Sequence, residues 1–380
     1  MKINKLSLVA SSMILSTTLL AENTLSAEGN FRAGFISDKA DSTSSTETLS
    51  AGGTLSIVSK DYKGFKFGST FSTTNSIFSM DKNSNASFLS SQNESFTLLS
   101  EAYVTGTLFG NTAMIVGRKF VDTPFADTDD WGMIKNSFEV YLLQNSDIKN
   151  LTITAGRVTE MAGVDAPIQD KFTKLNGSDG VNVIGLNYGL EDSGIEAQGW
   201  YYNAPDTIDL AYADLSKTLT VSEDIELSLS GQIAMQKLDS GDDNLIYGVE
   251  IAVSLPSNLS IFGAVNIATG DLTAQNGFGG GPFYTSVEQN TISCGEKEAK
   301  AFAGGVEYQL NEKLALSAVG SLVTNIDDDS VDEVDLVGSY VINDNASFDL
   351  IFSQYGSFTD ISSGETEDNT NIRAFLNYTF

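Results

Sequence analysis

Residues 371–380 read NIRAFLNYTF and alternate between two kinds of side chain. The apolar set is Ile372, Ala374, Leu376, Tyr378 and Phe380, and the interleaved set is Asn371, Arg373, Phe375, Asn377 and Thr379. Successive side chains of a β-strand point to opposite faces, so the pattern predicts a strand with one apolar face.

An alternating strand that stops on an aromatic residue resembles the last strand of bacterial outer-membrane barrels. In those proteins the terminal aromatic residue belongs to the signal that the barrel-assembly machinery reads. The resemblance therefore implies that Phe380 is recognised by this machinery and that the protein lies in the outer membrane of a Gram-negative bacterium. The alternative is an ordinary strand of a soluble β-sandwich.

The same alternation recurs along the chain. In 245–255 the apolar positions begin with Leu245, Tyr247, Val249 and Ile251, and Glu250 lies among the interleaved ones. Comparable segments are 225–233, 259–267, 334–342 and 348–352. The interleaved faces carry small polar residues and carboxylates, which is typical of strands that are apolar towards lipid and polar towards a water-filled lumen.

The lengths of the links between these strands separate a barrel from a sandwich. Eight short links of turn-forming residues fall at 61–63, 110–111, 146–149, 191–193, 218–222, 256–257, 311–312 and 343–344. Longer links fall between them, including 75–95, 122–136, 158–179, 269–298 and 357–369. This alternation predicts an all-β fold: a transmembrane antiparallel β-barrel of about eighteen strands, with short periplasmic turns and long outer loops.

The N-terminal residues 1–21 have two lysines followed by a moderately apolar run, as in a secretory signal peptide. Cleavage is expected after Ala21 or, alternatively, after Ala27, and a single porin-like barrel domain is expected over 28–380. A membrane anchor at the N-terminus is the alternative.

The composition excludes many chemistries. The chain has no His and one Cys, so triads that contain His, His-ligated metals and cysteine-rich clusters are excluded. With 21 Lys and Arg against 50 Asp and Glu, the net charge of −29 argues against nucleic-acid binding. We therefore expect neither an enzyme nor a bound cofactor. Cys294 is interpreted as a loop residue, with an intermolecular disulfide as the alternative.

Three segments carry a family resemblance. They are GRKFVDTPFADTDDWGMIKNSFEVYLL at 117–143, GGPFYTS at 280–286 with Glu288, and the WYY of 200–202 leading to Pro205. They resemble the OprD family of outer-membrane porins, in an epsilonproteobacterial-like form. The resemblance implies an eighteen-stranded channel, monomeric or homotrimeric, whose inward-folded loops narrow the pore. It also implies passage of small anionic nutrients along a ladder of lumenal arginines.

This chain departs from such a ladder because it has only four arginines. Strand parity turns Arg32 and Arg373 inward, while Arg118 and Lys119 are neighbours and cannot both face inward. Arg157 lies where a strand meets a long link, so its direction is open. From the resemblance, we expect Arg118, Asp127, Asp129 and Asp130 at or near the constriction.

The same strand parity predicts the sign of the net charge on the side chains that line the lumen. The acids assigned inward are Glu101, Glu139, Glu196, Asp209, Glu226, Glu250, Glu307, Asp335 and Asp349. The bases assigned inward are Arg32, Lys66, Arg373 and one of Arg118 and Lys119. Acids that outnumber bases favour cations. The alternative is that a few bases at the constriction preserve the passage of anions.

Other features are less specific. The glycines of GFGGG at 277–281 are interpreted as a flexible loop, because a phosphate-binding motif is absent. The acids of 127–130 and 327–329 are interpreted as solvated charge, or as weak divalent-cation bridges to lipopolysaccharide. The function expected is passive diffusion of small hydrophilic solutes and ions. The alternative is a structural or adhesive barrel, for which the only aromatic cluster is Phe278, Phe283 and Tyr284.

Overall fold

The structure, a computed structural model, describes residues 25–40, 44–79, 87–190 and 193–380. The expected signal peptide at 1–21 lies outside these residues. No helix in the described ranges is long and apolar enough to cross a membrane.

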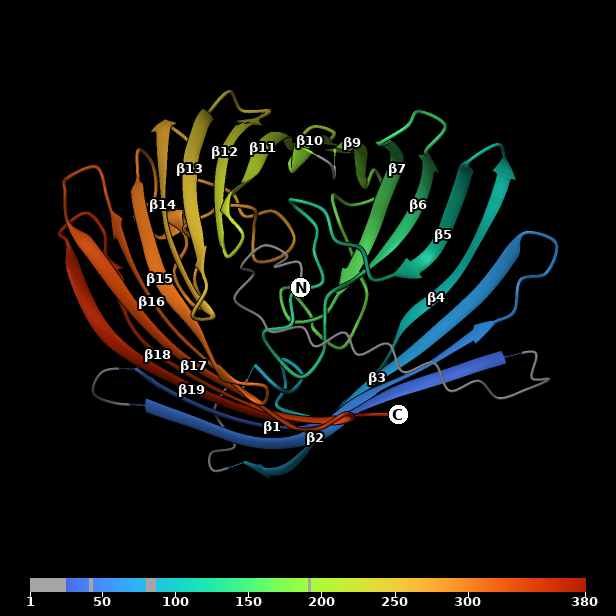
Figure 1. Cartoon of the computed structure of the whole chain (residues 1–380), viewed down its shortest axis with the longest axis horizontal. Helices are drawn as coiled ribbons and strands as arrows, with labels where there is room; N and C mark the ends of the chain where they lie inside the picture. Colours follow the sequence, from blue (N-terminus) through green and yellow to red (C-terminus); the bar gives the residue numbers. More distant parts are fainter. Residues whose placement is uncertain (1–24, 41–43, 80–86, 191–192) are drawn as a thin grey trace.

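Antiparallel strands form one closed sheet that surrounds a central lumen (Figure 1). The first strand pairs with the last, from Asn30 against Thr379 to Ala40 against Asn369, and this pairing closes the ring. A further two-residue strand, β8 (Thr173–Lys174), pairs with the end of β7. Eighteen strands make the wall over the described residues, which confirms the predicted barrel. They are β1 (Leu25–Ala40), β2 (Ser44–Ser59), β3 (Phe65–Ser79), β4 (Phe96–Phe109), β5 (Thr112–Lys119), β6 (Ser137–Asn145), β7 (Leu151–Ala162), β9 (Val181–Leu190), β10 (Ile195–Ala204), β11 (Ile208–Ser222), β12 (Ile225–Leu238), β13 (Asp243–Leu255), β14 (Leu259–Gly270), β15 (Lys300–Asn311), β16 (Leu314–Thr324), β17 (Ser330–Asn343), β18 (Ala346–Asp360) and β19 (Glu365–Thr379).

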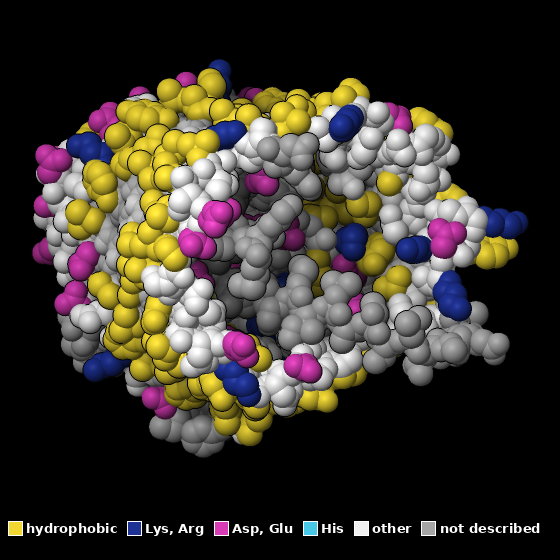
Figure 2. Space-filling view, viewed as in Figure 1, with side chains coloured by type: hydrophobic (Ala, Val, Ile, Leu, Met, Phe, Trp, Pro, Cys, Tyr) yellow, Lys and Arg dark blue, Asp and Glu magenta, His cyan; other side chains and the backbone are white. Residues whose placement is uncertain are grey.

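The two faces of the wall differ in polarity, as β17 shows. Glu333 and Asp335 are each 1% exposed, whereas Val334 and Leu336 between and beside them are 46% and 49% exposed. The apolar residues therefore point outward, and the carboxylates point into the barrel. Apolar side chains cover much of the outer wall in Figure 2, and several Asp and Glu side chains edge its opening. Because closure pairs the strand backbones around the whole ring, this outer face can meet lipid.

The strands extend further than the link lengths suggest, at the outer rim and at the periplasmic rim. β18 ends at Asp360 and β19 begins at Glu365, so the link predicted at 357–369 is a turn of four residues, 361–364. Similarly, β11 runs to Ser222, so the turn predicted at 218–222 lies at 223–224 instead. Polar residues at these positions still alternate across the sheet, so polarity alone did not mark where a strand ends.

Candidate functional site: the lumen and its inward loops

Two long links fold into the barrel and pack against each other. They are the loop of residues 120–136 between β5 and β6, and the loop of residues 271–299 between β14 and β15. A parallel bridge joins Ala126 to Phe278, and the Phe278 amide donates a hydrogen bond to the Phe125 carbonyl oxygen at 2.8 Å. Phe125 is fully buried, in edge-on contact with the rings of Tyr202 and Phe283. An apolar contact thus holds both loops inside the lumen.

The glycine-rich stretch at 277–281 belongs to this contact. Gly277 has φ +80°, and a Cβ atom there would lie 2.5 Å from the Phe125 carbonyl oxygen. Only glycine combines that backbone conformation with so close an approach. The residue is required for packing between the loops, in addition to any flexibility of the stretch.

Arg32 of β1 holds the first inward loop. Its guanidinium group donates to both carboxylate oxygens of Asp130, at 2.7 and 3.1 Å, and to the Gly132 carbonyl oxygen at 2.7 Å. A second base, Lys135, lies 3.8 Å from the same carboxylate. Across the barrel seam, Arg32 also donates to Asn377 at 2.8 Å. The loop is therefore tied to the wall at a charged, largely buried contact.

Arg373 of β19 holds the second inward loop. Its guanidinium group forms an ion pair with Glu288, and both side chains are almost fully buried. It also donates to the Trp131 carbonyl oxygen at 2.9 Å and stacks on the Trp131 ring at 4.3 Å. The indole nitrogen of Trp131 in turn donates to the Glu288 carbonyl oxygen at 3.2 Å. One arginine therefore contacts both inward loops.

Two buried carboxylates of β17 receive the tip of the second loop. Glu333 accepts hydrogen bonds from the backbone amides of Gln289 and Asn290, at 2.9 and 2.7 Å. Asp335 accepts one from the Glu288 amide at 3.4 Å. These inward acids position the loop, so they do not simply line an open channel.

Three acids cluster between the first inward loop and the loop of residues 163–180. Burial raises the pKa of Asp127 to about 6, with the charges of Asp165 and Asp122 adding to the effect. Burial also raises the pKa of Asp129 to about 8, reinforced by Asp165 and Asp127. Asp165 is linked to Asn136 by hydrogen bonds at 2.6 and 3.0 Å. No group of three His, Cys, Asp or Glu suited to a metal ion occurs within the described residues.

Three residues expected in the lumen lie on the outer face of the wall. Glu139 accepts a hydrogen bond from the hydroxyl of Tyr141, whose outward ring is 48% exposed. The strand register places Arg118 opposite Glu139, and Arg157 opposite Tyr141. The prediction of a lumenal Glu139 is therefore wrong. Arg118 is the outward member of the Arg118 and Lys119 pair, and Arg157, whose direction was open, also faces outward, so neither arginine lines the lumen. Near the outer rim, outward residues are polar, so polarity does not reveal their direction.

Lys119, the neighbour of Arg118, is the one that faces inward. It lies 3.4 Å from the carboxylate of Glu101 and stacks on the Tyr103 ring at 4.0 Å. The inward assignment of Asp209 is also wrong. Asp209 shares the outer face of β11 with exposed Leu215, while Asp214 is buried on the inner face. Other predicted lumenal acids lie between outward apolar neighbours and so face inward: Glu196, Glu226, Glu250, Glu307 and Asp349.

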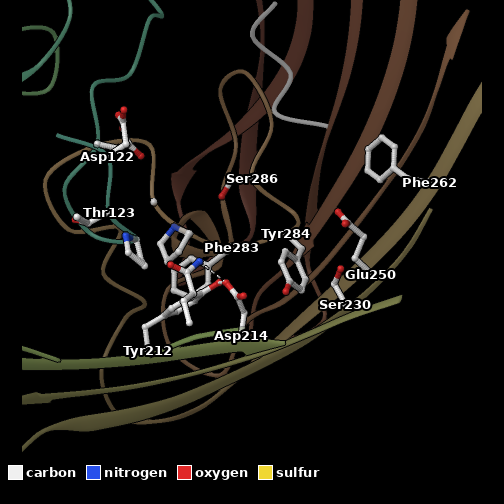
Figure 3. Close-up of a pocket in the computed structure, with 15 residues that line it drawn as sticks. Asp122, Thr123, Tyr212, Asp214, Ser230, Glu250, Phe262, Phe283, Tyr284 and Ser286 are labelled. Carbon is white, nitrogen blue, oxygen red and sulfur yellow. Dashed lines mark hydrogen bonds between the residues drawn. The ribbon is translucent and has the colours of Figure 1, made fainter. Parts of the chain in front are cut away.

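The inward loops and the wall border a partly open cavity of about 420 Å³ (Figure 3). Tyr212 and Asp214 reach it from β11, and Ser230 and Glu250 from the next two strands. Phe283 and Tyr284 come from the second inward loop, and Asp122 and Thr123 from the first, at the opposite side of the cavity.

Several residues of the lumen and its loops could not be identified from the sequence, because no sequence pattern marks them. Asp165 and Trp131 act through loop positions that only the folded barrel defines. Asp214 could have been found, because Leu215 and Leu219 mark the outer face of β11 and leave Asp214 inward. The aromatic cluster of Phe278, Phe283 and Tyr284 lies inside the barrel and not at a loop tip, which disfavours the adhesive alternative.

A closed antiparallel barrel with an apolar outer wall, a polar lumen and loops folded into that lumen defines an outer-membrane porin. The model of the family described as outer membrane porin, OprD family, matches residues 79–280, more than half of the sequence. The chain belongs to this family. Its members are channels for small solutes in the Gram-negative outer membrane, in contact with membrane lipid, and are not enzymes. None of the curated proteins matches the chain.

Solved structures agree with the fold at low sequence identity. OccK9 (OpdG) of Pseudomonas aeruginosa has a TM-score of 0.84 at 14% identity, covering 94% of this chain and 98% of its own. Acinetobacter baumannii OccAB1 has a TM-score of 0.78 at 17% identity, with coverage of 94% and 96%. Pseudomonas aeruginosa OpdK, crystallised with vanillate, has a TM-score of 0.79 at 12% identity, with coverage of 93% and 98%. At such identities these likenesses show the fold alone.

Proposed function

We propose that this porin is a passive diffusion channel for small hydrophilic solutes and ions, with a preference for cations. The observation that carries the preference is the pairing of the inward bases. Of the four bases that face inward, Arg32, Lys119 and Arg373 each form an ion pair with an acid, whereas no ion pair among the described residues includes Lys66. Among the described residues, no ion pair includes the inward acids Glu196, Glu226 and Glu307. Carboxylates along a narrow channel attract cations and raise their local concentration.

The constriction in this proposal is formed by the two inward loops, with Asp127, Asp129 and Asp130 on the first. Asp130 is neutralised by Arg32, so the field there depends on Asp127 and Asp129. OpdK was crystallised with vanillate, a carboxylate. A carboxylate in this lumen would meet a wall in which acids outnumber bases, so a strong preference for such solutes is not expected here.

The test is the reversal potential of single channels in a planar bilayer under a KCl gradient. We expect a reversal potential whose sign shows that potassium passes more readily than chloride. Its magnitude should be larger in dilute salt, because the carboxylate charges are screened less there. Replacing Glu196, Glu226 and Glu307 together by Gln should reduce it. Asp209→Asn, on the outer face of the wall, is the matched control and should leave it unchanged. A potential of the sign for chloride would overturn the cation preference.

Further features belong to the same proposal. Residues 1–21 are a signal peptide, the barrel domain spans 28–380, and the assembly machinery recognises Phe380, whose backbone exchanges hydrogen bonds with Gly29 of β1. Deleting Phe380 should lower the amount of assembled protein far more than the conductance of the channels that form. Lipopolysaccharide contact, the monomeric or homotrimeric state and the epsilonproteobacterial-like origin stay predictions.

A further inference from the structure

The lining of the cavity between the wall and the inward loops contains acidic side chains but no basic ones. Four of its fifteen lining residues are acids, namely Asp122, Asp127, Asp214 and Glu250, and none is Lys or Arg. Its volume of about 420 Å³ lies in the range of pockets that hold small organic molecules. A bound anion would face these acids without a compensating base in the lining.

Asp214 is held in place for an electrostatic role. Its carboxylate oxygen Oδ2 accepts hydrogen bonds from the Gln198 amide at 2.6 Å and from the Tyr212 hydroxyl at 2.9 Å. The two hydrogen bonds fix the direction of the carboxylate. Figure 3 shows Asp214 near Tyr284, Ser230 and Glu250 on the wall side of the cavity.

The rest of the lining suits an organic body more than a hydrated metal ion. The rings of Tyr212, Phe262, Phe283 and Tyr284 line the cavity beside the acids. Aromatic faces attract ammonium and guanidinium groups and bury apolar carbon. The hydroxyl oxygen of Ser286 is buried there and has no hydrogen-bond partner among the described residues, so a ligand N–H group could supply one.

We infer that this cavity is a binding subsite for small organic monocations that carry an ammonium or guanidinium group on a short apolar body and lack a carboxylate. The inference rests on the proposed diffusion channel and names a class of solute for it. The charged group lies by Asp214 and Glu250, and the apolar body lies against the rings. A monocation that pauses there obstructs the flow of smaller ions.

The experiment measures single-channel potassium current with benzylammonium added at millimolar concentration. Benzyl alcohol and benzoate have the same ring and serve as neutral and anionic comparisons. Benzylammonium should cause blocks that become more frequent with concentration, whereas the other two should cause few. If benzyl alcohol blocks as well as benzylammonium, the inference is wrong, whatever any variant does.

Variants locate the block. Asp214→Asn with Glu250→Gln should shorten the blocked periods about tenfold, while Glu307→Gln, an inward acid outside the cavity, should not change them. Unchanged blocks in the double variant, in protein that migrates on gels as the folded barrel does, would overturn the assignment. A chloride-selective channel refutes the proposed cation preference. A potassium-selective channel that benzylammonium does not block refutes the subsite alone.

Discussion

The guanidinium group of Arg32 in the first strand donates hydrogen bonds to both carboxylate oxygens of Asp130, which lies in the middle of the barrel's first inward loop. The contact spans 98 residues of sequence and joins the wall to the element that narrows the lumen. Paired and hydrogen-bonded charges of this kind have a defined geometry, so the loop is held in one position. Its position should therefore depend on this arginine.

Replacing Arg32 by Ala should release the loop of residues 120–136 and leave Asp130 with Lys135 as its remaining basic neighbour. Single-channel conductance should rise, and the open-channel current should become noisier. Arg157→Ala is the control, because it removes a guanidinium group that faces outward from β7. If conductance and noise equal those of the unaltered channel, the position of the loop that contains Asp130 does not depend on Arg32.

The Arg373–Glu288 pair should contribute to stability in a way that depends on pH. Removing one member of a buried ion pair costs about 3–5 kcal/mol. Burial raises the pKa of Glu288 while Arg373 opposes that rise, so in Arg373→Met the glutamate can take up a proton as the pH falls. The loss of stability in this variant should be smaller at pH 5 than at pH 8.

Gel migration after heating at each pH measures this stability, because folded and unfolded barrels migrate differently. Glu288→Gln is the matched comparison. Because Arg373 keeps its proton at both pH values, the loss of stability in this variant should be similar at pH 5 and pH 8. Equal losses for Arg373→Met at pH 5 and pH 8 would contradict the prediction.

Cation preference should rise with pH because of Asp127 and Asp129. Their raised pKa values of about 6 and 8 mean that each keeps its proton until the pH passes that value. Raising the pH from 5 to 9 therefore adds negative charge to the loop of residues 120–136. The carboxylates that raise these pKa values further are Asp165, Asp122 and Glu288.

Reversal potentials in a KCl gradient at pH 5, 7 and 9 measure the rise. Replacing Asp127 and Asp129 by Asn should flatten it. Asp147→Asn, in an exposed periplasmic turn where hydrogen bonds lower the pKa of the carboxyl group, should leave the rise intact. A rise that persists in the Asp127 and Asp129 variant would have to come from other acids.

Gly277→Ala should separate the two inward loops, because the added Cβ atom would lie 2.5 Å from the Phe125 carbonyl oxygen. We expect altered conductance with several levels, seen in bilayer recordings. Gly241→Ala is the control: it also has a positive φ of +112°, but no atom lies within 4 Å of the added Cβ. If both variants behave alike, backbone strain and not the loop contact is responsible.

How far the sequence predicts this structure differs between wall and lumen. In 245–255, alternation within the apolar belt identifies the strand and the inward direction of Glu250, because lipid tolerates only one arrangement. Near the outer rim both faces of the wall are polar, so the direction of Arg157 stayed open and the inward assignment of Glu139 was wrong. The partners of Asp130 and Glu288 arise from long-range packing of loops, for which local patterns contain no information.

The two arginines that hold the inward loops lie in the strands that meet at the barrel's seam, Arg32 in β1 and Arg373 in β19. Most contacts of the loops are with strands on their own side of the seam, as in the hydrogen bonds of Gln289 and Asn290 to Glu333. Two hydrogen bonds need the closed ring, from Arg373 to Trp131 of the first loop and from Arg32 to Asn377 of the last strand. An open assembly intermediate would lack both, so sealing the barrel also completes the support of its constriction.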